Sequence, residues 1–98
     1  MIIIYWSTRA EENYDDILDY LEKSWPLRIK NKFATDVRSV IKGIERFPRM
    51  YPQFGDDKNL RKAVINPHVS LFYEIISDDE VELVCFWNNR RNPDDLPL

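Results

Sequence analysis

Three consecutive runs of the chain decide its fold: Leu60-Arg61-Lys62-Ala63-Val64-Ile65, Val69-Ser70-Leu71-Phe72-Tyr73-Glu74-Ile75-Ile76 and Val81-Glu82-Leu83-Val84-Cys85-Phe86-Trp87. The breaks between them, Asn66-Pro67-His68 and Ser77-Asp78-Asp79-Glu80, consist of turn-forming residues. Short runs rich in β-branched and aromatic residues, separated by such turns, are typical of an antiparallel meander. We therefore predict three antiparallel strands between Leu60 and Trp87.

Two amphipathic helices are predicted ahead of this meander. Apolar residues recur every three or four positions, first at Ala10, Tyr14, Ile17, Leu18, Leu21 and Trp25 and then at Ile29, Phe33, Val37, Val40, Ile41 and Ile44. Thr8 and Glu11 have the spacing of a capping box, which predicts that the first helix begins there and runs to about Lys23. Gly43 and Pro48 mark the end of the second helix. The short break at residues 24–26 predicts an antiparallel helical hairpin.

Met1 to Trp6 is predicted to be a further strand, and it is apolar on both faces. We therefore expect it inside the sheet rather than at a wet edge. Residues 47–55 contain two prolines and a glycine, which predicts a loop that its aromatic residues pin to the core. The element order β-α-α-β-β-β predicts an α+β fold, with a helical hairpin packed on a mainly antiparallel four-stranded sheet. A chain of 98 residues is expected to form a single domain over residues 1–98.

Strand alternation predicts an apolar sheet face that meets the helices. That face is expected to hold Val69, Leu71, Tyr73 and Ile75 on one strand and Val81, Leu83, Cys85 and Trp87 on the next. The opposite face is expected to be mixed, with Ser70, Glu74, Glu82 and Asn88. The face that Arg61 joins depends on the strand register, which the sequence leaves open.

The charge balance argues against indiscriminate binding to nucleic acid. The chain carries 14 basic and 17 acidic side chains, whereas such binders usually have a basic excess. The charge is also segregated, because residues 1–24 hold six acids and two bases while residues 26–50 hold seven bases and two acids. Two readings remain: the helix faces of opposite sign attract one another, or the basic face receives an acidic partner.

Several features predict a cytoplasmic protein without a membrane partner, a metal or a cofactor. No stretch approaches the roughly 20 apolar residues of a membrane helix, and the apolar N-terminus is too short for a signal peptide. Cys85 is the only cysteine and is expected to be a buried free thiol, which fits a reducing compartment. One histidine and one cysteine, far apart in sequence, do not form a zinc-ligand pattern.

Four sequence marks resemble a known family. They are, in order, Tyr51-Pro52, Leu60-Arg61, Phe72-Tyr73-Glu74-Ile75 and the ending Trp87-Asn88-Asn89-Arg90-Arg91-Asn92-Pro93. Their order in a β-α-α-β-β-β chain resembles the RelE/ParE superfamily of bacterial toxins from type II toxin–antitoxin modules. The arginine-asparagine-proline ending is similar to that of its branch called plasmid-stabilisation proteins. The resemblance covers nearly the whole chain.

The resemblance implies a cytoplasmic toxin that arrests growth when free. Its partner would be a small cognate antitoxin that lays a helix or strand on the toxin, a common recognition mode. We expect either the basic outer side of the second helix or the mixed sheet face to receive it. A dimer and a toxin–antitoxin hetero-oligomer both remain compatible with the sequence.

The targets diverge within the superfamily, since RelE-like members cut mRNA on the ribosome and ParE-like members poison DNA gyrase. Metal-independent RNA cleavage needs a base for the 2′-hydroxyl, cations for the phosphate and an acid for the leaving oxygen. RelE-type enzymes carry a tyrosine, histidine or glutamate near the chain end for this purpose. After Trp87 this chain has only Asn, Arg, Pro, Asp and Leu. The sequence therefore favours a ParE-like toxin over a RelE-like endoribonuclease, with an inactive antitoxin-binding protein as a third reading.

The catalytic candidates, if the chain is an enzyme, are Arg61 and His68. Arg61 matches the sheet arginine of the family, with Lys62 beside it as a further phosphate- or target-binding candidate. The alternative role for Arg61 is a structural ion pair with Glu74 or Glu82. His68 is the only histidine in the chain and is either a general acid or base or an exposed turn residue.

Three residues at the end of the meander complete the candidate set for target or phosphate binding. Arg90 and Arg91 either clamp a phosphate or an acidic partner, for which arginine is well suited, or belong to a solvated tail. Trp87 is either part of the core or a stacking surface for a base or a partner.

Overall fold

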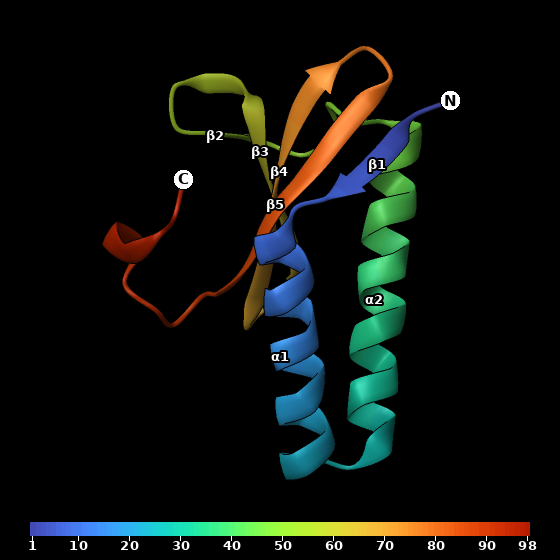
Figure 1. Cartoon of the computed structure of the whole chain (residues 1–98), viewed down its shortest axis with the longest axis vertical. Coiled ribbons are helices and arrows are strands. Elements are labelled where there is room, and N and C mark those ends of the chain that lie inside the picture. The colour runs from blue at the N-terminus through green and yellow to red at the C-terminus, as the bar shows by residue number, and fades with distance from the viewer.

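Two helices lie on one face of a five-stranded sheet in the computed structural model, which describes residues 1–98 (Figure 1). The elements are, in order, β1 (Ile3–Trp6), α1 (Thr8–Ser24), α2 (Leu27–Arg46), β2 (Gln53–Phe54), β3 (Asp57–Asn66), β4 (Val69–Ser77), β5 (Glu80–Asn88) and the 3₁₀ turn η1 (Pro93–Asp95). This arrangement confirms the α+β class and the predicted hairpin on a sheet. The two-residue β2 is an additional strand that the sequence did not predict.

The sheet has the strand order β1-β5-β4-β3-β2. β3, β4 and β5 form the predicted antiparallel meander, and β1 pairs with β5 in parallel. The prediction that the first strand lies inside the sheet is wrong, because β1 is an edge strand whose Ile3 and Tyr5 side chains are exposed. The apolar run serves one sheet face only, because Ile4 and Trp6 pack against the core while Ile3 and Tyr5 do not.

α1 begins one residue earlier than the capping box predicted. Ser7 is the N-cap, and its Oγ accepts a hydrogen bond from the Ala10 N–H at 3.0 Å. The same hydroxyl donates to the Val84 carbonyl oxygen of β5 at 2.8 Å. The proposed Thr8–Glu11 box is therefore wrong, because Ser7 caps the helix and also ties it to the sheet.

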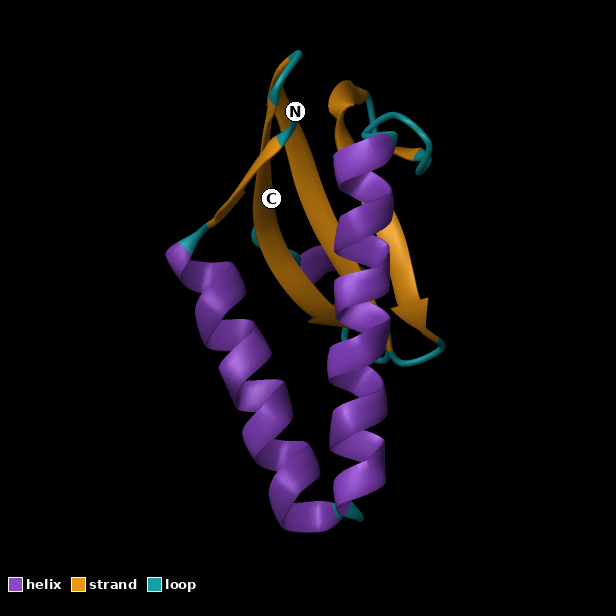
Figure 2. Cartoon of the chain, turned by 90° about the vertical axis from the view of Figure 1, so that its right-hand side faces the viewer, coloured by secondary structure: helices purple, strands orange, loops and turns teal.

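The main core lies between the hairpin and the sheet, where Tyr14 of α1 packs near Phe33 of α2 and Phe86 of β5. The hairpin end projects beyond the sheet in the side view (Figure 2). Trp25, predicted in the apolar stripe, lies after the end of α1 and is exposed. The only ion pair between the two helices is Glu22–Lys30, at 3.5 Å, and such a pair contributes little stability beside the apolar packing. Neither helix is long and apolar enough to cross a membrane.

A bulge in β5 changes which side chains share a sheet face. Phe72 pairs with Cys85 while its neighbour Tyr73 pairs with Leu83, so Val84 is an extra residue in β5. Leu83 consequently packs toward the helices, whereas Cys85 and Trp87 lie on the opposite face with Phe72. The predicted common face for Val81, Leu83, Cys85 and Trp87 is therefore wrong. Tyr73 and Cys85 are buried, as predicted.

Candidate functional site

A groove lies on the sheet face that points away from the helices. Its eight lining residues come from β2, β3, β4, β5 and the C-terminal tail, which we define as residues 89–98, and its volume is about 180 Å³. Figure 1 shows the tail turning back beside β5 toward β2. The groove brings together three of the predicted target-binding residues: Lys62, Trp87 and Arg91.

Aromatic rings form part of the groove lining, and two cations lie near them. The Phe54 and Phe72 rings meet edge to face, with centroids 4.9 Å apart. The Lys62 Nζ lies 6.0 Å from the Phe72 ring centroid, and the Arg91 guanidinium carbon lies 4.5 Å from that of Trp87. These cation–π contacts hold both cations at the groove. Trp87 is buried in an apolar cluster, as the core alternative predicted, and its ring also contacts Arg91, whereas stacking on a base or a partner stays a prediction.

The chemistry of the groove favours binding of an anion. Its lining includes a lysine and an arginine but no carboxylate, histidine or tyrosine. Cys85 belongs to the apolar cluster that also holds the groove residues Phe72 and Trp87, and burial raises the pKa of its thiol to about 11. The thiol is therefore protonated and unreactive at neutral pH.

Asn89 fixes the start of the tail against the turn between β3 and β4. Its backbone N–H donates to the His68 carbonyl oxygen at 2.8 Å, and its side-chain amide donates to that of Pro67 at 3.3 Å. Its Oδ1 accepts a hydrogen bond from the buried Ser70 hydroxyl at 2.8 Å. The sequence did not predict this role, for which the only signal is an asparagine pair directly after the predicted strand.

Arg61 lies on the opposite sheet face and does not line the groove. Its Nε donates to the Lys58 carbonyl oxygen at 2.9 Å, and its Nη1 donates to those of Tyr51 and Arg49 at 3.0 and 3.3 Å. The ion pair with Glu74 or Glu82, considered as the structural alternative, is not formed. Arg61 instead holds the α2–β2 loop, which we define as residues 47–52.

Tyr73 holds the same loop from the neighbouring strand. Its hydroxyl donates to the Pro48 carbonyl oxygen at 2.6 Å, and its ring meets Tyr51 edge to face at 6.3 Å. Burial raises the pKa of Tyr73 to about 12, and the nearby Arg61 only partly opposes this shift. The expected loop pinned by aromatics is thus found for Tyr51, whereas Phe47 is exposed.

The structure does not bring the two catalytic candidates together. His68 is exposed in the turn between β3 and β4, where its backbone N–H donates to the Asn66 side chain. Arg61 pairs with Tyr73, four residues along β4 from Val69 at that turn. At about 3.3 Å per residue this separation is roughly 13 Å. Arg90 is exposed and also lies outside the groove lining.

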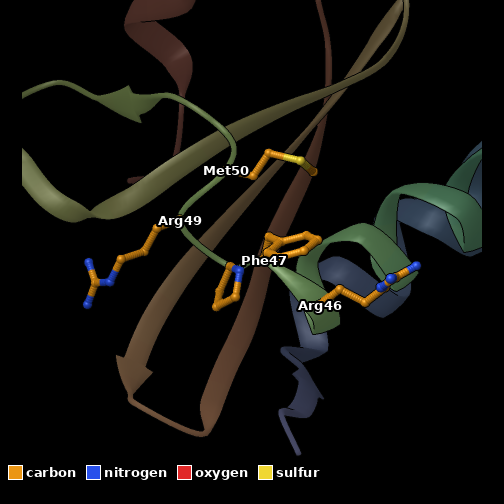
Figure 3. Close-up of a pocket in the computed structure, with 5 residues that line it drawn as sticks. Arg46, Phe47, Arg49 and Met50 are labelled. Atoms are coloured by element: carbon orange, nitrogen blue, oxygen red, sulfur yellow. The ribbon is translucent and has the colours of Figure 1, made fainter.

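A second, more open hollow lies at the end of α2. It has a volume of about 490 Å³ and is lined by Arg46, Phe47, Pro48, Arg49 and Met50 (Figure 3). It shares no lining residue with the groove. No group of three or more histidine, cysteine or carboxylate side chains is arranged to hold a metal ion in the structure.

A comparison with protein families shows which family the chain belongs to. Residues 4–93 match the family described as the ParE toxin of the type II toxin–antitoxin system parDE. The chain belongs to the ParE toxin family. The matched residues include the α2–β2 loop and most of the residues that line the groove of this ParE-family chain.

Solved structures have the same fold as this ParE-family chain. One titled "Chromosomal ParDE TA system from P. aeruginosa" has a TM-score of 0.72 at 13% identity, covering 90% of this chain and 96% of that one. A YoeB/ParE toxin from Agrobacterium tumefaciens has a TM-score of 0.64 at 14% identity, covering 90% and 98%. A YoeB–YefM complex from Staphylococcus aureus has a TM-score of 0.62 at 16% identity, covering 88% and 94%. No curated protein sequence matches the chain.

Proposed function

We propose that this ParE-family chain arrests growth by binding DNA gyrase through the groove, without cleaving RNA. The observation that supports this proposal is the set of polar side chains in the groove. Lys62 and Arg91 attract anions, while the lining has no carboxylate, histidine or tyrosine to act as a general base. Cationic side chains without a general base are suited to binding an anionic surface.

Arg91 is the central binding residue of this proposal. Its guanidinium rests on Trp87, and a planar guanidinium binds a carboxylate or a phosphate through two parallel hydrogen bonds. The aromatic contact restricts the arginine before the target arrives, which reduces the entropy lost on binding. Lys62 adds a second cation near the Phe72 ring.

The combination of aromatic rings and cations also favours a second candidate function, a RelE-like ribosome-dependent mRNA endoribonuclease. Aromatic side chains that stack bases beside cations that hold phosphates are common in proteins that bind single-stranded nucleic acid. This function would require a proton carrier from outside the groove. His68, on the turn that Asn89 contacts, is the candidate for that role.

The experiment that separates these functions is induction of the chain without its antitoxin, followed by mapping of mRNA ends and DNA breaks. We expect gyrase-dependent DNA breaks while mRNA stays intact. Prompt, codon-phased mRNA cuts would instead identify an endoribonuclease. Normal growth at high expression would identify an inactive protein that only binds its antitoxin.

We further propose a cognate antitoxin as the natural partner. This proposal is supported by the family to which the chain belongs and by the similar YoeB–YefM complex from Staphylococcus aureus. Co-expression with the antitoxin encoded beside the gene is expected to restore growth. Continued arrest in the presence of a stably produced antitoxin would contradict it.

A further inference from the structure

The hollow at the end of α2 has the composition of a protein-binding surface. Phe47 and Met50 are 58% and 55% exposed, although both are large apolar side chains. The Arg46 guanidinium carbon lies 5.8 Å from the Phe47 ring centroid. Aromatic residues, methionine and arginine are the types enriched where proteins bind each other. We call Arg46, Phe47, Pro48, Arg49 and Met50 the loop surface.

The backbone beneath the loop surface is held in place before any partner binds. Arg61 binds the carbonyl oxygens of Arg49 and Tyr51, and the Tyr73 hydroxyl binds that of Pro48. The Met50 N–H donates to the Phe47 carbonyl oxygen at 3.0 Å. An irregular loop with these restraints loses little further freedom on binding, which favours affinity.

α2 supports the loop surface from the other side. A Cβ placed on Gly43 would lie 3.4 Å from Met50 Cε and 3.5 Å from the Tyr51 hydroxyl oxygen. The loop therefore packs closely over this glycine. The end of the Met50 side chain thus contacts α2, while more than half of the Met50 and Phe47 side chains stays exposed.

The charges of the loop surface indicate what kind of segment would fit. The Arg46 and Arg49 side chains extend in opposite directions from the Phe47 ring (Figure 3), and no lining residue is acidic. A complementary segment would place an apolar side chain against Phe47 and Met50, with carboxylates on both sides. An amphipathic helix meets this need when acids lie three or four positions before and after a bulky apolar residue.

We infer that the loop surface docks an acidic amphipathic helix of the cognate antitoxin. This inference rests on the proposed function, because it takes the antitoxin as the partner. The groove and the loop surface share no lining residue. Loss of docking at the loop surface therefore frees the toxin from neutralisation and leaves its toxicity unchanged.

The test compares two loop-surface variants with two matched controls. Phe47→Ala removes the exposed ring, and Leu27→Ala is its control because Leu27 is 63% exposed at the hairpin end. Arg46→Glu with Arg49→Glu reverses two charges, and Lys23→Glu with Arg28→Glu makes the same charge change at the exposed hairpin end. All four proteins are checked for folding by circular dichroism and thermal unfolding.

The probe is the full-length antitoxin encoded beside the gene, titrated into each purified toxin variant by calorimetry. Truncation or reversal of central interface residues weakens binding by about 10- to 30-fold. We expect a loss of this size for Phe47→Ala and for the Arg46/Arg49 variant, and less than about a twofold change for the controls. The Arg46/Arg49 variant is also expected to show a weaker dependence of affinity on salt.

Growth assays with co-expressed antitoxin complete the test. Loop-surface variants that stay toxic but escape neutralisation support the inference. Wild-type affinity in both variants overturns it, and so does loss of toxicity with antitoxin binding intact, which would assign the surface to the target. Failure of the wild-type toxin to bind the antitoxin would overturn the proposed partner as well, so the two failures are distinguishable.

Discussion

At the scale of single residues, the main finding is that Arg61 and Lys62, adjacent in sequence, have separate tasks. Lys62 lines the groove, whereas Arg61 binds three backbone carbonyl oxygens on the other side of the sheet. The sequence identified both as candidate binding residues but did not show which face of the sheet each side chain joins. The reason is physical, since two of the three acceptors of Arg61 lie in an irregular loop whose position depends on the whole fold.

Substitution of Arg61 is expected to destabilise the protein. Arg61→Ala removes three hydrogen bonds to backbone carbonyl oxygens, and because water can replace the two exposed ones we expect a cost of about 1–2 kcal/mol of unfolding free energy. Equilibrium unfolding in urea measures this cost. Arg49→Ala, which removes an exposed side chain of the same loop, is expected to stay within about 0.5 kcal/mol of wild type. Equal stability of the two variants would show that the Arg61 hydrogen bonds contribute nothing.

Tyr73 is expected to make the protein less stable at alkaline pH. Burial raises its pKa in the folded state from 10.0 to about 12, so folding favours the protonated phenol. The stability that this preference contributes is present below pH 10 and is lost as the pH rises toward 12. Urea unfolding at pH 9 and pH 11.5 measures this change. Between these pH values the free energy of unfolding is expected to fall less for Tyr73→Phe than for wild type. Cys85→Ala serves as a parallel variant, because burial also raises the pKa of that thiol.

At the scale of elements, local patterns predicted the helices and the meander well, because periodicity and turn residues are local signals. The β5 bulge was missed because the positions around Val84 read as ordinary alternation, and only pairing with β4 places the extra residue there. This one residue moves Cys85 and Trp87 to the groove side of the sheet. The groove therefore could not be predicted from the strand pattern alone.

The start of α1 provides a test at this scale. Ser7→Ala removes both the cap of Ala10 and the hydrogen bond to Val84, which is expected to cost about 1–2 kcal/mol of unfolding free energy. The matched variant Thr8→Ala changes a neighbouring exposed hydroxyl and is expected to be nearly neutral. Thermal unfolding compares the two. A larger loss for Thr8→Ala would restore the capping box predicted from the sequence.

At the scale of the whole molecule, the fold brings the C-terminal tail against the sheet, and together they form the groove. The family resemblance predicted the overall fold, and the residues after Trp87 predicted a cationic ending. The sequence grouped Arg90 with Arg91, however, and only the folded tail separates them. Arg91 rests on Trp87 in the groove, whereas Arg90 lies outside its lining.

The neighbouring arginines allow the groove to be tested with a single-residue control. Arg91→Ala is expected to raise the expression level needed for growth arrest by about tenfold or more, because a central arginine contact contributes strongly to binding. Arg90→Ala removes the same charge from the adjacent position and is expected to leave that level nearly unchanged. Titrated induction measures both, with thermal unfolding as a check that each variant folds. Equal effects of the two substitutions would mean that net charge in the tail governs toxicity, rather than the arginine held on Trp87.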